Sequence, residues 1–323
     1  VELHKMWLNL APDSQYYDSN DYHLRTEQEI IEWFDVYGID SSTMIQAVNE
    51  IVDKCNVEIE FGGQNYPVFC DDPERYVRAR CNEGYKERGI SKYPDKKRYI
   101  DQIQYELSVL KQLDYMNYFC IIDDMLKWCR DNHIPTGLGR GSVVGSCVSW
   151  IMGITQIDPI KFNLVFERFA NPERVTPADC DSDVSTPCRG MVIDYIKEKY
   201  GNVYQVRTIN VIQDKSAVQR AGQSLGIEPK EIINMSKNIN SVDDMKAGKW
   251  KDLALKFKGH IISYGCHASA ILVAPKDVCT WTAVEKQGDN MVVCHDFHQL
   301  EEQGLLKLDI LGLETLDIIE QTK

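Results

Sequence analysis

The feature that most constrains this chain is a set of aspartates in two segments that otherwise predict strands. In TPADCDSDV, Asp179, Asp181 and Asp183 recur every second residue, so in an extended segment they project from one face. In GLLKLDILGLE, Asp309 interrupts an apolar run typical of a buried strand. Aspartate is disfavoured in strands, and clustered carboxylates are costly unless solvent or a divalent cation neutralises them. The fold must therefore either solvate these carboxylates or hold cations between them.

Taken separately, each acidic segment has an ordinary explanation. The first is also typical of an acidic edge strand or a solvated loop, and Lys307 is a candidate ion-pair partner for Asp309. Together, the Asp-x-Asp pair of Asp181 and Asp183 and the single Asp309 give the three carboxylates that two-metal phosphoryl transfer requires. Hard oxygen ligands favour Mg²⁺ or Mn²⁺. We therefore expect two Mg²⁺ ions, with Mn²⁺ as a substitute, at these three aspartates.

A glycine-rich segment, TGLGRGSVVGSC, precedes an apolar run that predicts a helix. Glycines let backbone N–H groups approach an anion, and the N-terminus of the following helix adds a positive field. Ser142 is a candidate cap for that helix, and Arg140 offers a bidentate phosphate contact. The segment lacks the Gly-Lys-Ser/Thr ending of a P-loop and the GxGxxG spacing of a dinucleotide site. It predicts a phosphate-binding loop of another kind, with a tightly packed turn as the alternative.

The histidines and cysteines indicate no further metal centre. His267 precedes a run that predicts a buried strand, where we expect a structural histidine, with a substrate contact as the alternative. His295 and His298 flank Asp296 without completing a ligand set, so we place them at the surface. The eleven cysteines include no Cys-x-x-Cys pair, which argues against a zinc ribbon or disulfide framework and for reduced core residues.

Composition bounds the size and setting of the protein. With 323 residues and 43% apolar content, the chain is long enough for two or three structural units. No apolar window suits a membrane span, and the start, VELHKMWLNL, lacks the features of a signal peptide, so we expect a cytoplasmic protein without membrane partners. The net charge of −13 counts against a general nucleic-acid binder, because phosphate affinity comes from excess Lys and Arg. An acidic metal site accounts for part of that charge.

Periodicity predicts a mixed α and β protein. Capping signals and apolar spacing indicate several helices, and residues 98–132 are apolar enough to contain at least one buried helix. Their ranges are 26–37, 42–55, 72–89, within 98–132, 191–200 and from 313 onward. Strand patterns cover residues 175–184, 270–274, 291–294 and 305–310. Residues 211–263 are charged, helical in pattern and free of strand signals, which predicts a small helical subdomain.

Three motifs carry a resemblance to a known family. The run GLGRGSVVGSCVSWIMGITQIDPIKFNLVFERFANPERV resembles, almost residue by residue, the glycine-serine motif of the catalytic alpha subunit of bacterial DNA polymerase III, the C-family replicative polymerases. ADCDSDV is similar to that family's Pro-Asp-Phe-Asp-x-Asp-Phe catalytic strand. GLLKLDILGLETLDII is similar to the segment that carries its third aspartate. The similarity extends from about Tyr22 to the C-terminus.

The resemblance implies a fold and a set of roles. The implied fold is α/β (α+β), a palm related to polymerase beta-like nucleotidyltransferases with a mixed sheet, flanking N-terminal helices and an inserted helical thumb. Asp181 and Asp183 would ligate both metals and Asp309 the catalytic metal. The residues expected to contact the triphosphate of an incoming dNTP are Gly139, Arg140, Gly141, Ser142 and Lys307. Asp179 matches the family's first motif aspartate, which we interpret as structural.

The resemblance also predicts domains and partners. It implies an N-terminal helical segment and linker over residues 1–55, after a missing PHP domain, a palm over 56–212 and 265–323, and a thumb over 213–264. Fingers and clamp-binding regions would follow the last residue, so we expect weak or no processive synthesis by this chain alone. The expected partners are primer-template DNA, dNTP and, through absent regions, the sliding clamp and other replisome subunits.

Several residues depart from the family pattern and predict a divergent member, of the kind found in phages or mobile elements. Ala178 and Cys180 replace the usual Pro and Phe, Gln219 stands where Arg is common, and Cys294 opens a Cys-His pair in place of Gln-Phe. These changes leave the three carboxylates intact. The expected function is DNA-directed DNA polymerase activity. The alternatives are a catalytically silent scaffold of a replication complex and a metal-dependent phosphohydrolase built on the same carboxylates.

Overall fold

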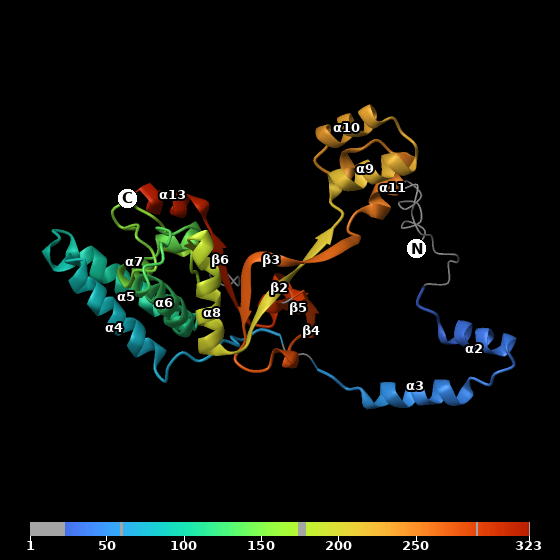
Figure 1. Cartoon of the computed structure of the whole chain (residues 1–323), viewed down its shortest axis with the longest axis horizontal. Helices are drawn as coiled ribbons and strands as arrows, with labels where there is room; N and C mark the ends of the chain where they lie inside the picture. The colour runs from blue at the N-terminus through green and yellow to red at the C-terminus, as the bar shows by residue number, and fades with distance from the viewer. Residues whose placement is uncertain (1–22, 59–60, 174–178, 289, 323) are drawn as a thin grey trace. The chain divides into compact units, whose positions relative to one another are not determined.

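The computed structural model describes residues 23–58, 61–173, 179–288 and 290–322 (Figure 1). The chain divides into two compact units, one formed by residues 60–208 and 265–323 and the other by residues 1–59 and 209–264. Helices combine with a six-stranded mixed sheet, so the predicted α+β class is confirmed. Residues 1–22 of the predicted N-terminal segment lie outside the described ranges. None of the described helices is long and apolar enough to cross a bilayer.

The sheet has the strand order β1-β6-β3-β2-β5-β4. The strands span Ser182–Val184 (β1), Val203–Val211 (β2), Ile261–Val273 (β3), Val284–Gln287 (β4), Asn290–Asp296 (β5) and Leu306–Gly312 (β6). β1 is parallel to β6 and β2 to β5, whereas β6 is antiparallel to β3 and β4 to β5. The pairing of β1 with β6 places the strand that contains Asp183 next to the strand that contains Asp309.

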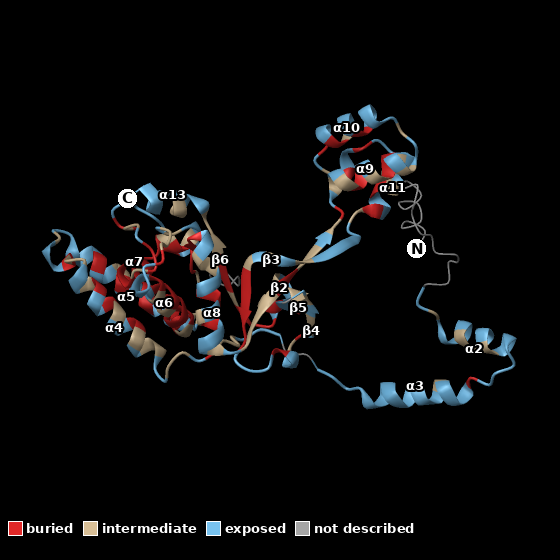
Figure 2. Ribbon diagram, in the orientation of Figure 1, coloured by how far each residue is buried: buried red, intermediate tan, exposed pale blue. Residues whose placement is uncertain are grey.

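Local signals predict the start of the first helix of the larger unit and the end of its fifth. The first five α-helices of this unit are α4 (Pro73–Glu87), α5 (Lys96–Gln112), α6 (Met116–Asp131), α7 (Cys147–Met152) and α8 (Arg189–Tyr200). The Asp72 side chain accepts the N–H of Arg75 and caps α4, Pro73 occupies its first turn, and Gly201 ends α8. All six residues of α7 are buried, and Figure 2 shows α6 with a largely buried face. These helices form one side of the main core.

Both faces of β3 are covered near its C-terminal end. Ile271 and Val273 join the core formed with α4–α8, while Ala270 and Leu272 join a second cluster with Val293 of β5. The second cluster includes Leu300 of α12 (Phe297–Glu302). A strand covered on both faces is a continuous apolar run, without alternating polar residues. Such a run was visible in the sequence, and this part of β3 was therefore predicted. After β6, the chain ends in α13 (Glu314–Thr322), the predicted final helix.

The predicted strand pattern was incomplete. β2 and β4 were missed, and β3 begins at Ile261 instead of residue 270 because its first half is largely exposed and carries no burial pattern. The expectation that residues 211–263 lack strands is therefore wrong at both ends. Of the strand predicted over 175–184, only Ser182–Val184 is extended in β1, and residues 174–178 lie outside the described ranges.

The smaller unit contains a helical cluster and two further helices. α9 (Asp214–Ser224), α10 (Pro229–Asn238) and α11 (Lys249–Phe257) pack around an apolar centre that includes Val218, Ala254 and Phe257. The predicted helices near the start are α2 (Glu27–Val36) and α3 (Ser42–Lys54), and neither contains a buried residue. Thr26 and Glu29 form the predicted capping box of α2.

Candidate active site

Asp181 and Asp309 come together because their strands pair in parallel. Ser182 of β1 pairs with Ile310 of β6, so the residues immediately before them lie at the same end of the strand pair. Carboxylate oxygens of Asp179, Asp181 and Asp309 all lie within 4.8 Å of one another. The structure thus brings together two members of the predicted set and adds Asp179, which the sequence led us to interpret as structural.

Asp183, the third predicted ligand, lies beside this group and is joined to it by Arg140. Nη2 of Arg140 is 3.6 Å from Asp181 Oδ1 and 3.5 Å from Asp183 Oδ1. The Asp183 side chain is only 8% exposed, and its Oδ1 accepts no hydrogen bond. Burial raises the pKa of Asp183, against the opposing effect of Arg140. A buried carboxylate oxygen without a hydrogen-bond donor is available to a cation.

Lys307 lies among the carboxylates of the same group. Its Nζ is 2.9 Å from Asp309 Oδ2, the ion pair considered from sequence, and 3.2 Å from Asp179 Oδ2. Burial lowers the pKa of Lys307, but attraction to Asp179 and Asp309 outweighs burial and raises it overall. By formal charge, the four aspartates face two cations, Lys307 and Arg140, which leaves two negative charges. The arrangement therefore favours the approach of further positive charge.

Strand β3 supplies a polar contact that the sequence did not indicate. Ala270 pairs with Asp309, and the hydroxyl of the preceding Ser269 donates to Asp309 Oδ1 over 3.2 Å. His267 Nδ1 accepts the backbone N–H of Ala270 over 3.0 Å, so the backbone engages this ring nitrogen. Ser269 was missed because the strand was predicted to start one residue later, and only the pairing register reveals its position.

The glycine-rich loop contacts the acidic strand directly. Gly137 donates its N–H to Asp183 O over 2.9 Å, and a Cβ added to Gly137 would lie 2.8 Å from Asp183 Cβ. Gly141 has φ of +71°, which favours glycine, and its added Cβ would be 3.5 Å from Asp181 Oδ2. Gly141 and Ser142 begin the short 3-10 helix Gly141–Gly145. Of the loop residues predicted to bind phosphate, Arg140 and Gly141 therefore lie next to the carboxylates, whereas Gly139 faces Thr155.

The helix after the loop does not offer its N-terminus to a ligand. Ser146, and not Ser142, caps α7 by accepting the N–H of Ser149 over 3.0 Å. The carboxylate of Glu106 accepts the next two backbone N–H groups, those of Cys147 and Val148, each over 2.9 Å. The prediction that this helix terminus and a Ser142 cap serve phosphate binding is therefore wrong, because a buried carboxylate already satisfies the donors.

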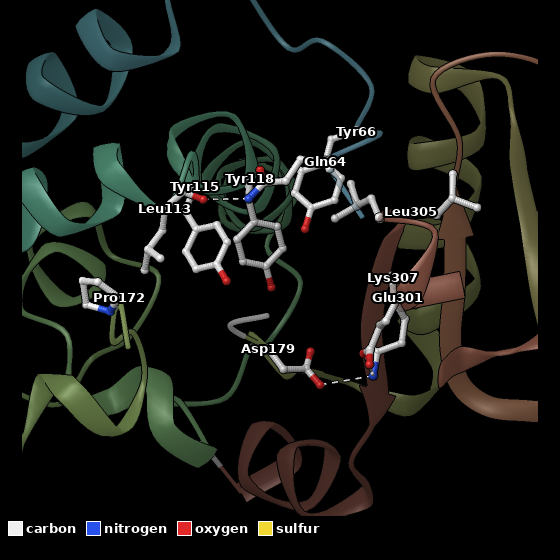
Figure 3. A pocket seen from close by; sticks show the side chains of 13 residues that line it. Gln64, Tyr66, Leu113, Tyr115, Tyr118, Pro172, Asp179, Glu301, Leu305 and Lys307 are labelled. Carbon is white, nitrogen blue, oxygen red and sulfur yellow. Dashed lines mark hydrogen bonds and ion pairs between the residues drawn. The ribbon is translucent and has the colours of Figure 1, made fainter. Parts of the chain in front are cut away.

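A cavity of about 280 Å³ adjoins the carboxylates (Figure 3). Tyr66, Tyr115 and Tyr118 line it opposite Asp179 and Lys307, and Figure 3 shows the hydroxyls of Tyr115 and Tyr118 directed toward the side where Asp179 lies. Burial raises the pKa of Tyr118 well above its usual value, so its phenol stays neutral. That phenol oxygen accepts the Cys180 N–H over 2.9 Å and so fixes the backbone between Asp179 and Asp181.

The other candidate metal ligands do not form a site. Within the described ranges, neither His295 nor His298 belongs to a cluster of three or more ligating side chains. His295 instead contacts Gln303 Oε1 through Nδ1, at 3.3 Å. All eleven cysteines lie in described ranges and are free thiols, but only five of them are buried, so the expectation that most are core residues is wrong. The candidate functional side chains therefore lie on the acidic strands and the glycine-rich loop.

Comparison with known proteins assigns the chain to a family. The sequence model described as "Bacterial DNA polymerase III alpha NTPase domain" matches residues 75–312, a range that includes both acidic segments and the glycine-rich loop. The chain belongs to this family. The match to DNA polymerase III alpha runs from the first turn of α4 to the end of β6 and so includes all six strands of the sheet.

Individual polymerase III alpha subunits show the same relationship. The subunit of Buchnera aphidicola subsp. Acyrthosiphon pisum is 32% identical, over 93% of this chain and 28% of its own length. The subunit of Pseudomonas fluorescens is 32% identical, over 94% of this chain and 29% of its own length. The subunit of Escherichia coli strain K12 is 30% identical, over 93% of this chain and 28% of its own length. The chain therefore spans less than a third of the length of these polymerase III alpha relatives.

Proposed function

We propose that this chain carries the nucleotidyl-transfer site of a DNA-directed DNA polymerase, in which Asp181, Asp183 and Asp309 hold two divalent cations. The observation that carries the proposal is the parallel pairing of β1 with β6, which sets Asp181 beside Asp309. The hydrogen bond from Gly137 N–H to Asp183 O holds the start of the glycine-rich loop beside these carboxylates. Membership of the polymerase III alpha family supports the same assignment.

The side chains present suit Mg²⁺, with Mn²⁺ as a substitute. Every candidate ligand is a carboxylate oxygen, the donor type that these hard cations prefer. Asp183 Oδ1 is buried without a hydrogen bond, and the formal charges leave the group negative. When bound, two such cations would activate the attacking oxygen and stabilise charge on the transferring and leaving phosphates. Asp179 lies close enough to contribute to the same cations.

The remaining site residues would bind and orient the triphosphate of a dNTP. Arg140 and Lys307 supply positive charge on two sides of the carboxylates, and both now pair with aspartates. A phosphate chain would give each a new anionic partner, which frees carboxylate oxygens for cations. The small residues Gly139, Gly141 and Ser142 would let backbone N–H groups approach the phosphates. Orientation of the α-phosphate toward a primer 3′-hydroxyl is then the task of the loop.

The proposed partners follow from this reaction. They are dNTP and primer-template DNA, and further parts of the polymerase would bind the sliding clamp and other replisome subunits. The proposed location is the cytoplasm. The proposed palm comprises residues 56–212 and 265–323, and the proposed thumb residues 213–264. Lysines are numerous in the thumb region, and exposed ones such as Lys215, Lys230 and Lys237 suit contact with a phosphate backbone.

The proposal is tested by cation-dependent nucleotide binding. Calorimetry on the chain should detect Mn²⁺ binding and dATP binding that requires Mg²⁺ or Mn²⁺, and Asp181→Asn should weaken both. Absence of either binding event, or an unchanged Asp181→Asn variant, would overturn the assignment.

A polymerase that contains this chain and the rest of the subunit distinguishes the alternative functions. Primer extension that disappears in Asp309→Asn is the expected result, and pyrophosphate should be released only with primer-template present. Nucleotide hydrolysis without primer would instead identify a phosphohydrolase. Primer extension that persists in Asp309→Asn would assign these carboxylates a silent, structural role.

A further inference from the structure

Helix α7, which follows the glycine-rich loop, is held at both ends by charged side chains from other helices. At its C-terminal end, Arg80 of α4 donates to Met152 O over 3.3 Å, and Arg130 of α6 donates to Gly153 O over 2.9 Å. At its N-terminal end lies Glu106 of α5. Each charge has the sign that complements the helix dipole. The helix is therefore a fixed support, and its two ends are satisfied by protein groups.

Glu106 makes the N-terminal part of this support. Its side chain is fully buried, and its two carboxylate oxygens accept four hydrogen bonds. Three come from the segment that ends the loop, namely Ser146 Oγ over 2.8 Å and the Cys147 and Val148 N–H groups over 2.9 Å. The fourth comes from Gln102 on the same helix as Glu106, over 2.9 Å. A buried carboxylate that gathers three donors from one segment fixes the path of that segment.

The loop between its two ends has little room to adjust. Its first end is tied to β1 by the bond from Gly137 N to Asp183 O. A Cβ at Gly139 would lie 2.9 Å from Thr155 Cβ, and one at Gly145 would lie 2.6 Å from Val165 O. The loop is thus fixed by Asp183 at one end and by Glu106 at the other, with Gly141 in between.

We propose that Glu106 is a positioning residue for the triphosphate: by fixing the C-terminal end of the glycine-rich loop, it holds Gly141 and Ser142 beside Asp181. The inference rests on the proposed nucleotide-binding function of this loop. Glu106 acts through the hydroxyl of Ser146 and the backbone of Cys147 and Val148, and makes no bond to the proposed metal ligands. A neutral side chain of the same shape lacks the second accepting oxygen, so it would leave a buried N–H or hydroxyl without a partner.

Hydrogen exchange tests the positioning role without any ligand. In the whole 323-residue chain, Glu106→Gln should speed exchange of peptides covering residues 137–148 by about tenfold. Peptides that contain β1 and β6 should keep their parental rates. Asp124→Asn is the control, because Asp124 is a largely buried carboxylate of α6 whose partners, Tyr195 and Lys199, lie on α8 and not on the loop or α7. Unchanged loop exchange in Glu106→Gln, or an equal increase everywhere, would overturn the proposal.

Ligand binding separates positioning from a general structural role. Glu106→Gln should weaken binding of Mg²⁺–dATP about tenfold while the affinity for Mn²⁺ alone stays at the parental value. Glu106→Asp, which retains two accepting oxygens on a shorter stem, should recover part of the dATP affinity and also covers the case in which Glu106→Gln fails to fold. A parallel loss of both affinities would overturn the proposal. If the parent chain binds Mn²⁺ but no dATP, the nucleotide function fails, while the exchange experiment still decides whether Glu106 fixes the loop.

Discussion

Gly137 donates its backbone N–H to the carbonyl oxygen of Asp183 over 2.9 Å. Thr136 forms a bridge with Val184, and Ser185 donates its N–H to Pro135 O over 3.0 Å, so the segment before the loop runs along β1. β1 has β6 on its other side, with Asp309. The glycine-rich loop and the two acidic strands are therefore parts of one hydrogen-bonded structure, and a change at Gly137, where the loop meets β1, should disturb Asp183.

Gly137→Ala should displace Asp183. The new Cβ would lie 2.8 Å from Asp183 Cβ and 3.2 Å from its Oδ2, which is closer than van der Waals contact allows. We expect urea denaturation to show a loss of roughly 1–3 kcal/mol in the free energy of unfolding, as for other overpacked sites. Gly190→Ala is the control, because it has open space in α8, where alanine is preferred to glycine by roughly 0.5–1 kcal/mol. Equal stability of Gly137→Ala and the parent would contradict the close contact.

Asp179→Asn should lower the affinity for Mn²⁺ about tenfold, because it removes one of three negative charges grouped within 4.8 Å. Calorimetric titration of the chain with Mn²⁺ measures the effect. Asp194→Asn removes an exposed carboxylate on α8 and should bind Mn²⁺ as the parent does. If Asp179→Asn also matches the parent, Asp179 has the structural role that its sequence position suggested.

Tyr118→Phe should destabilise the chain by about 1–3 kcal/mol, because it leaves the buried N–H of Cys180 without an acceptor. Tyr105→Phe removes a comparable hydroxyl, but the bond from Tyr105 to Glu167 is exposed and its loss should cost less than about 1 kcal/mol. Urea unfolding of the two variants measures the difference. Equal losses would mean that the Tyr118 hydroxyl does not support the backbone between Asp179 and Asp181.

Sequence predicted the parts of this fold that local interactions determine. The capping box of Thr26, the start of α4 at Pro73 and the end of α8 before Gly201 depend on neighbouring residues alone. β2 and the exposed half of β3 were missed, because their partners are remote in sequence and their side chains are not buried in a regular pattern. The same limit applies to the site. Aspartates are visible as motif residues, whereas the contact of Ser269 with Asp309 depends on strand register.

Glu106 illustrates that limit and leads to a prediction about pH. In sequence it is one glutamate of a helix, with no signal of burial. In the structure, burial raises the pKa of Glu106 to about 7 from its ordinary value of 4.5, although four hydrogen bonds oppose the shift. The folded state therefore binds its proton more tightly than the unfolded state does. The resulting stabilisation is fully present below pH 4.5 and is lost as pH rises through 7.

The free energy of unfolding of the parent should therefore fall relative to that of Glu106→Gln between pH 5 and pH 8, by on the order of 3 kcal/mol. Urea denaturation at intervals across this range measures both proteins, and their difference removes the contribution of other titrating groups. The nearby thiols of Cys81 and Cys147 do not add to it, because burial raises the pKa of each above this range. Gln102→Leu, which keeps the carboxylate, should retain the pH dependence of the parent. Parallel curves for the parent and Glu106→Gln would show that Glu106 titrates alike in the folded and unfolded chains.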